Sequence, residues 1–138
     1  MPVSSKIMDR VFKKIRSKHR TILINAKNYK KEMLSIYKQQ HVLALVVDQR
    51  PAYLEGSFWL HFFSRPTPFF SPPENSAHRH KVPVGFSSFK TIKRGYYKFE
   101  TTIITLYAST TTKCELPNKY TNFLAFTVRA QPNYYLWS

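Results

Sequence analysis

Residues 42–47 form a continuous apolar run, VLALVV, that leads directly into Asp48, Gln49, Arg50 and Pro51. An apolar run without alternation is typical of a parallel strand that is covered on both faces. We therefore predict a buried strand over residues 41–47. Ligands of such sheets bind beyond the carboxyl ends of the strands. Asp48, one of only seven acidic residues in the chain, is accordingly a candidate site residue; the alternative is that it caps a turn before Pro51.

The residues before this run predict two helices and a further strand. Residues 6–18 carry apolar side chains at helical spacing and indicate an amphipathic helix, with Ser4 or Ser5 as its N-cap. Residues 21–25 predict a short strand, and residues 27–40 predict a second helix. The order helix, strand, helix, strand indicates an α/β fold with right-handed crossovers.

The second half of the chain predicts an irregular region, a hairpin and a helix. Residues 51–81 contain five prolines and many aromatic residues. Such a region is usually a functional loop or disordered, and the aromatic residues argue against disorder. Within it, residues 74–80 predict a short helix. Residues 82–92 and 96–106 predict a β-hairpin with Gly95 in its turn, and residues 118–129 a helix. We predict a single α/β domain over residues 1–138, with a mixed sheet flanked by helices and a C-terminal hairpin and helix.

The composition narrows the partners of such a domain. Lys and Arg number 22 against 7 Asp and Glu, a formal charge of +15, so an anionic partner is expected. Aromatic residues make up 16% of the chain, which fits base stacking and fits equally a place among lipid headgroups. One cysteine, Cys114, excludes an intrachain disulfide. No apolar run approaches the roughly 20 residues of a membrane span. His78 and His80 are the one close pair of histidines, and we do not expect a zinc site there.

Six stretches of the chain together match the motifs of one family. They are DRVFKKIRSK, VVDQRP, WLHFFSRPTPFFSPPENSA, VPVGF, KTIKRGYYKFE and AQPNYYLWS, in this order and over nearly the whole chain. The chain thereby resembles the lipid A biosynthesis acyltransferases of the Bacteroidetes type. These lauroyl and myristoyl transferases belong to the lysophospholipid acyltransferase-like superfamily.

The resemblance implies a transferase of glycolipid and lipopolysaccharide biosynthesis. Such an enzyme moves a fatty acyl chain from the thioester of acyl carrier protein to a hydroxyl of a lipid A precursor, without a further cofactor. The implied location is the cytoplasmic face of the inner membrane, where this chain is peripheral. The implied partners are the lipid A precursor, acyl carrier protein and the membrane surface, with no specific nucleic acid.

Three features of the chain depart from the family. In the family a histidine acts as the general base, and an Asp or Glu five residues later orients it. None of the five histidines here has an Asp or Glu at that position. We therefore expect no catalytic residue and no activity from this chain alone. The second departure is that the basic tail that follows YLWS in the family is missing. We interpret the chain as a C-terminal portion without the membrane helix, the His-x4-Asp/Glu segment and this tail. Two residues before Glu74 the family has glycine, whereas this chain has Pro72, which lacks glycine's conformational range and its N–H.

Three residues match substrate-binding positions of the family. Arg16 matches an arginine that holds the phosphorylated acceptor; a surface helix charge is the alternative. Asp48 matches the acid that faces the active-site cleft, and Glu74 matches the Glu of the TPFF…E block. Trp59 and the neighbouring loop aromatics fit an acyl groove, membrane contact or core packing. The competing interpretation is a non-catalytic basic module that binds RNA or an anionic membrane, with strong salt dependence.

Overall fold

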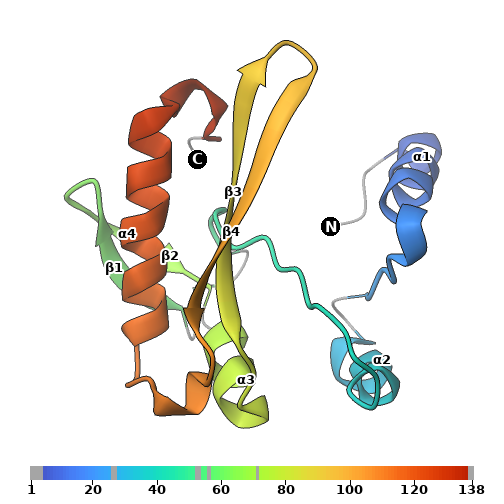
Figure 1. Cartoon of the computed structure of the whole chain (residues 1–138), viewed down its shortest axis with the longest axis horizontal. Coiled ribbons are helices and arrows are strands. Elements are labelled where there is room, and N and C mark those ends of the chain that lie inside the picture. Colours follow the sequence, from blue (N-terminus) through green and yellow to red (C-terminus); the bar gives the residue numbers. More distant parts are fainter. Residues whose placement is uncertain (1–4, 26–27, 52–53, 56, 71, 137–138) are drawn as a thin grey trace. The chain divides into compact units, whose positions relative to one another are not determined.

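The computed structural model describes residues 5–25, 28–51, 54–55, 57–70 and 72–136. The chain divides into two compact units, Met1–Ala44 and Leu45–Ser138 (Figure 1). The first unit contains helices, and the second combines helices with two small antiparallel sheets. This mixture agrees with the predicted α/β class in its general sense. A single domain over residues 1–138 stays a prediction.

The first unit contains both helices that the apolar periodicity of the sequence predicts. Helix α1 spans Lys6–Arg16, and the Ser5 side chain accepts a hydrogen bond from the Met8 N–H as the predicted N-cap. A single 3-10 turn follows at Lys18–Arg20, and α2 spans Tyr29–Ile36. Helix α2 ends four residues before the predicted boundary at residue 40. Ser4 and Lys27, which the predictions also named, lie outside the described residues.

The prediction of strands over residues 21–25 and 41–47 is wrong, because neither segment forms a strand. Val42 and Val46, expected inside a sheet, are 94% and 83% exposed. A strand needs a neighbouring strand for its backbone hydrogen bonds, and an apolar run supplies side chains to bury but no such neighbour. Both described sheets are antiparallel pairs, so the predicted mixed sheet with parallel crossovers is wrong as well.

A hairpin occupies the region predicted to be irregular. Strand β1 (Phe58–Phe62) pairs antiparallel with β2 (Arg65–Phe69), and the pairing of Phe62 with Arg65 leaves a two-residue turn. Phe63 and Ser64 in this turn have φ of 48° and 63°. Positive φ at both central residues is typical of the type I′ turn, which matches the twist of the strands.

The remaining elements of the second unit confirm the predictions. Helix α3 spans Pro72–His80 and α4 spans Glu115–Ala130. Strands β3 (Val84–Lys93) and β4 (Tyr96–Thr105) form the long C-terminal hairpin. Gly95 lies in its turn with φ of 80°, a conformation that favours glycine.

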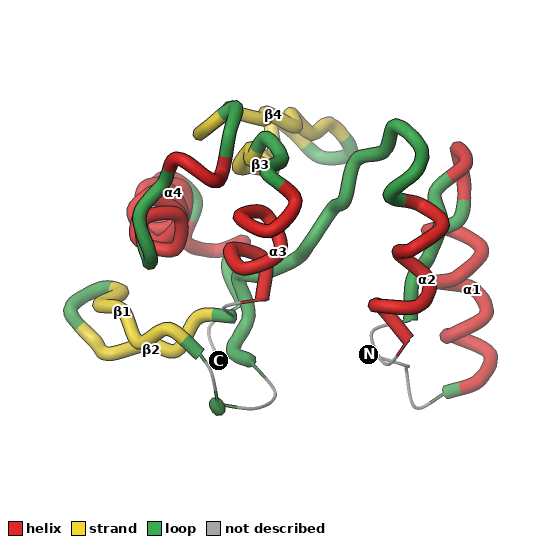
Figure 2. Tube along the Cα trace, turned by 90° about the horizontal axis from the view of Figure 1, so that it is seen from below, coloured by secondary structure: helices red, strands yellow, loops and turns green. Residues whose placement is uncertain are grey.

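Helix α4 lies between the two hairpins and contacts both of them (Figures 1 and 2). Against β1 and β2 it forms a core of four buried apolar side chains, contributed by Phe62, Phe69, Leu124 and Val128. Against β3 it forms an aromatic contact, because the Phe86 ring lies 5.2 Å from Tyr120 and 5.6 Å from Phe123, centroid to centroid. A smaller core joins α3, α4 and the 3-10 turn Ala108–Thr110 through Ala77, Leu116 and Ala108. The β1–β2 hairpin is thus held by apolar burial on α4.

Candidate functional site

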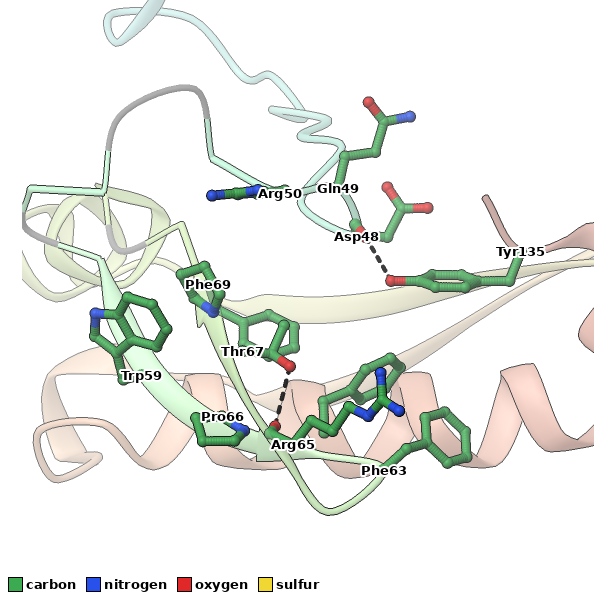
Figure 3. Close-up of a pocket in the computed structure, with 12 residues that line it drawn as sticks. Asp48, Gln49, Arg50, Trp59, Phe63, Arg65, Pro66, Thr67, Phe69 and Tyr135 are labelled. Atoms are coloured by element: carbon green, nitrogen blue, oxygen red, sulfur yellow. Dashed lines mark hydrogen bonds between the residues drawn. The ribbon is translucent and has the colours of Figure 1, made fainter. Parts of the chain in front are cut away.

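A cleft of about 630 Å³ opens in the second unit between the β1–β2 hairpin and the bend that follows residue 47 (Figure 3). Its lining joins polar residues of the bend to strand residues and to the C-terminal segment. The lining residues are Asp48, Gln49, Arg50, Trp59, Phe62, Phe63, Arg65, Pro66, Thr67, Pro68, Phe69 and Tyr135. Most of this lining is aromatic or proline, and its charges are two guanidinium groups and one carboxylate.

Asp48 is held in the cleft by a residue far along the chain. The Tyr135 phenol donates a hydrogen bond to the Asp48 backbone carbonyl, with an oxygen-to-oxygen distance of 2.9 Å (Figure 3). The Tyr135 ring in turn packs on Phe62, with 5.9 Å between the ring centroids. The bend and the β1–β2 hairpin are therefore linked through one side chain.

The C-terminal segment that carries Tyr135 is anchored by the Gln131 side chain. Its amide oxygen accepts from the Thr91 N–H at 3.3 Å, and its amide nitrogen donates to the Thr91 carbonyl at 3.1 Å. These two bonds replace those of a neighbouring strand at β3 and fix the point where α4 ends. The 3-10 turn Pro132–Tyr134 then directs Tyr135 back to the cleft.

The Asp48 carboxylate has an unused hydrogen-bonding position. Its Oδ1 atom is buried and has no hydrogen-bond partner among the described residues. A buried acceptor without a partner costs about 1–3 kcal/mol, so such an atom in a cleft is suited to accept from a ligand donor. Burial raises the pKa of the Tyr135 phenol, and the negative charge of Asp48 raises it further. Tyr135 therefore stays protonated as the hydrogen-bond donor at neutral pH.

Two arginines bring positive charge to the cleft. Arg50 lies two residues after Asp48, in the upper part of the view in Figure 3, and Arg65 is the first residue of strand β2, in the lower part. Both side chains are exposed, and neither forms an ion pair with a carboxylate of the described residues. A guanidinium offers several N–H donors in one plane, a geometry that matches phosphate and carboxylate oxygens.

Aromatic side chains supply the apolar wall. Phe62 and Phe69 are buried and meet edge to face with 5.9 Å between their centroids, a favourable arrangement of two aromatic rings. Trp59 is 58% exposed at the cleft, so of its alternatives the structure excludes core packing. The cleft therefore combines an apolar surface with two guanidinium groups that can bind an anion and a carboxylate oxygen that can accept a hydrogen bond.

Of the three predicted site residues, only Asp48 lines the cleft. Arg16 is exposed in the last turn of α1, in the first unit, where its guanidinium lies 5.7 Å from the Phe12 ring centroid. Glu74 lies in the first turn of α3, where it is 5% exposed, and its Oε1 atom is buried without a hydrogen-bond partner among the described residues. The helix that contains it begins at Pro72, so this proline occupies a position that it tolerates. The binding roles of all three residues stay predictions.

Sequence reasoning did not find Arg50, Arg65 or Tyr135 as site residues. Arg50 had a usable signal, since it comes two positions after Asp48 at the expected site. Arg65 had none, because the strand that places it was predicted as irregular. Tyr135 is 87 positions from the carbonyl that it binds, and no local pattern predicts such a contact.

Some kinds of site are not seen in the part of the chain that the structure describes. No group of three His, Cys, Asp or Glu side chains is placed to hold a metal ion there. Over the same residues, no helix combines the length and the apolar character needed to cross a bilayer. Comparisons with protein-family models, with curated proteins and with solved structures found no match to this chain.

Proposed function

We propose that this chain is a lipid A acyltransferase-like protein whose Asp48 cleft binds the phosphorylated glycolipid of that chemistry. The observation that carries the proposal is the Oδ1 of Asp48, which has no partner among the described residues, in a cleft that also contains aromatic walls and two guanidinium groups without an ion pair to those residues. A glycolipid of this class offers hydroxyl donors, phosphate oxygens and acyl chains. Each of these three groups finds a chemical counterpart in the cleft.

The assignment of each group follows from charge and hydrogen-bonding capacity. A sugar hydroxyl can donate to Asp48 Oδ1, and phosphate oxygens can accept from Arg50 and Arg65. An acyl chain can lie against Trp59 and Phe69. The motif resemblance around Asp48 supports the same ligand class, because the matching acid of the family faces the active-site cleft.

We propose binding without turnover. Acyl transfer in the family needs a base on the acceptor hydroxyl, and none of the five histidines in these 138 residues has the matching acid five positions later. Removal of a general base costs about 10²–10⁴-fold in rate. The acyl carrier protein and the inner-membrane location remain parts of this proposal that rest on the resemblance.

Tryptophan fluorescence provides a direct test, because the chain has two tryptophans and one of them lines the cleft. In a Trp137→Phe background, Trp59 is the only tryptophan. A lipid A precursor in detergent micelles should change its emission in a saturable manner, and micelles alone should not. Arg50→Ala and Arg65→Ala should each weaken binding by about tenfold, since each removes a charged hydrogen bond.

Arg94→Ala is the matched control, because Arg94 is an exposed arginine in the turn of the β3–β4 hairpin and does not line the cleft. It should leave the affinity unchanged. An equal loss of affinity in all three variants would show that binding depends on the net charge of the chain and not on the two arginines of the cleft. Absence of a saturable change in the background protein would overturn the proposal.

The basic composition favours a second candidate, an RNA-binding module. Its affinity would fall steeply with salt and would not depend on the apolar wall of the cleft. A single-stranded RNA titrated in the same assay separates the two candidates. Binding of RNA with no binding of the precursor would favour the module.

A further inference from the structure

Helix α1 presents an exposed apolar face. None of its residues is buried. Ile7 is 77% exposed, Ile15 is 55% exposed and Phe12 is 37% exposed. Exposed apolar residues that occur singly are ordinary, whereas a contiguous apolar patch marks an interaction site.

The apolar residues of α1 form one arc. At 3.6 residues per turn, Ile7, Met8, Val11, Phe12 and Ile15 fall within about 140° of the helix circumference. Lys14 lies just beyond one edge of this arc, and Arg16 lies just beyond the other. Long cationic side chains at both borders of an apolar arc can keep their charges at a polar boundary while their carbon stems lie along apolar surface.

The polar face of α1 is strongly cationic. The helix carries one acidic residue, Asp9, whose carboxylate is paired with Lys13 at 2.7 Å. Its basic residues number five, namely Lys6, Arg10, Lys13, Lys14 and Arg16. The partner of this helix must therefore offer an apolar region that covers the apolar arc and anionic groups next to that region.

We propose that α1 is an interfacial helix that lies in the plane of an anionic membrane. Ile7, Val11 and Ile15 enter the boundary between headgroups and acyl chains, while Lys14 and Arg16 contact lipid phosphates. An apolar arc on a low-hydrophobicity, Lys- and Arg-rich helix is the pattern of such helices. An RNA would satisfy the cations and leave the apolar arc in water, so the membrane accounts for more of the surface.

This inference does not rest on the glycolipid cleft. It assigns Arg16 to bilayer phosphate through its place at the border of the apolar arc. The cleft lies in the other unit and plays no part in the interaction. Vesicles without glycolipid therefore test α1 alone.

The test is cosedimentation of the full chain with phosphatidylcholine vesicles, with and without about 30 mol% phosphatidylglycerol. We expect binding to the anionic vesicles that weakens as salt rises, and little binding to the neutral ones. The double variant Ile7→Ser/Ile15→Ser keeps every charge and should weaken anionic-vesicle binding by about tenfold or more. Because both side chains are exposed, this variant should fold as the parent does.

The matched control is Ile92→Ser/Ile103→Ser on the β3–β4 hairpin, where the two isoleucines are 67% and 59% exposed. This variant should bind anionic vesicles as the parent does. The proposal is overturned if the α1 double variant binds like the parent or if neutral vesicles bind equally well. Retention of single-stranded RNA with no retention of vesicles would also overturn it, and would assign the cations of α1 to nucleic acid.

Discussion

The Tyr135 phenol donates a hydrogen bond to the Asp48 carbonyl at 2.9 Å, although the two residues are 87 positions apart. This bond holds the bend that contains the candidate site residue against the segment that follows α4. Gln131, through its two bonds to Thr91, sets the position from which Tyr135 reaches the bend. The geometry of the cleft therefore depends on residues that are far from Asp48 in the sequence.

Tyr135→Phe should lower the free energy of unfolding by about 1 kcal/mol, because it removes one partly buried hydrogen bond and keeps the ring on Phe62. Urea denaturation followed by circular dichroism measures this change. Tyr134→Phe, at a tyrosine that is 68% exposed, is the control and should leave the midpoint unchanged. Equal midpoints for parent and Tyr135→Phe would show that the bond contributes nothing to stability.

Introducing glycine into the β1–β2 turn should raise stability, and removing glycine from the β3–β4 turn should lower it. Ser64→Gly should stabilise the protein by about 1 kcal/mol, because Ser64 has φ of 63°, where a side chain is strained. Gly95→Ala should destabilise it by a similar amount, about 1 kcal/mol, because it places a Cβ at φ of 80°. Thermal melts of both variants check the pair. A lower melting temperature for Ser64→Gly would contradict the strained turn.

Tyr120 predicts a loss of stability at alkaline pH. Burial raises the pKa of its phenol above the ordinary value, and the negative charge of Asp48 and the neighbouring Tyr135 add to the effect. The folded chain thus holds this proton more tightly than the unfolded chain. Its contribution is complete below about pH 10 and is lost progressively as the pH rises above that value.

Tyr120→Phe removes the titrating group and should flatten part of this alkaline decline. Urea midpoints measured from about pH 8 to about pH 11 for parent and variant give the comparison. Tyr107→Phe, at a tyrosine that is 62% exposed, serves as the control and should keep the decline of the parent. Parallel curves for parent and Tyr120→Phe would contradict the assignment.

Glu74 is a buried carboxylate with one oxygen that has no hydrogen-bond partner in the described part of the chain, so its replacement by an apolar side chain of similar length should raise stability. We expect about 1 kcal/mol for Glu74→Met, because the cost of an unsatisfied buried acceptor exceeds the favourable interaction of the charge with the α3 N-terminus. Glu55→Met, at an exposed glutamate, should change stability by less than about 0.5 kcal/mol. A large loss of stability in Glu74→Met would mean that the carboxylate is satisfied in solution.

The local patterns of the sequence determined the helices and the long hairpin. Apolar periodicity and the Ser5 cap specified α1, and Gly95 between two β-rich runs specified the β3–β4 turn. These elements are predictable because the hydrogen bonds that define them join residues close in sequence. Asp48 was predicted as a candidate site residue because it follows an apolar run interpreted as a buried strand; that strand does not form, although Asp48 does line the cleft.

Tertiary structure alone decided the sheet partners and the cleft. The run over residues 42–47 has the composition of a buried strand, yet a strand forms only where another strand supplies backbone partners, and no strand of the described residues pairs with this run. The β1–β2 turn has Phe63 and Ser64 in place of the usual Gly, Asn or Asp, so its signal is missing from the sequence; burial of Phe62 and Phe69 on α4 stabilises it instead. Long-range burial and the Tyr135 bond to Asp48 assemble the cleft, and contacts between residues so far apart leave no periodic trace in the chain.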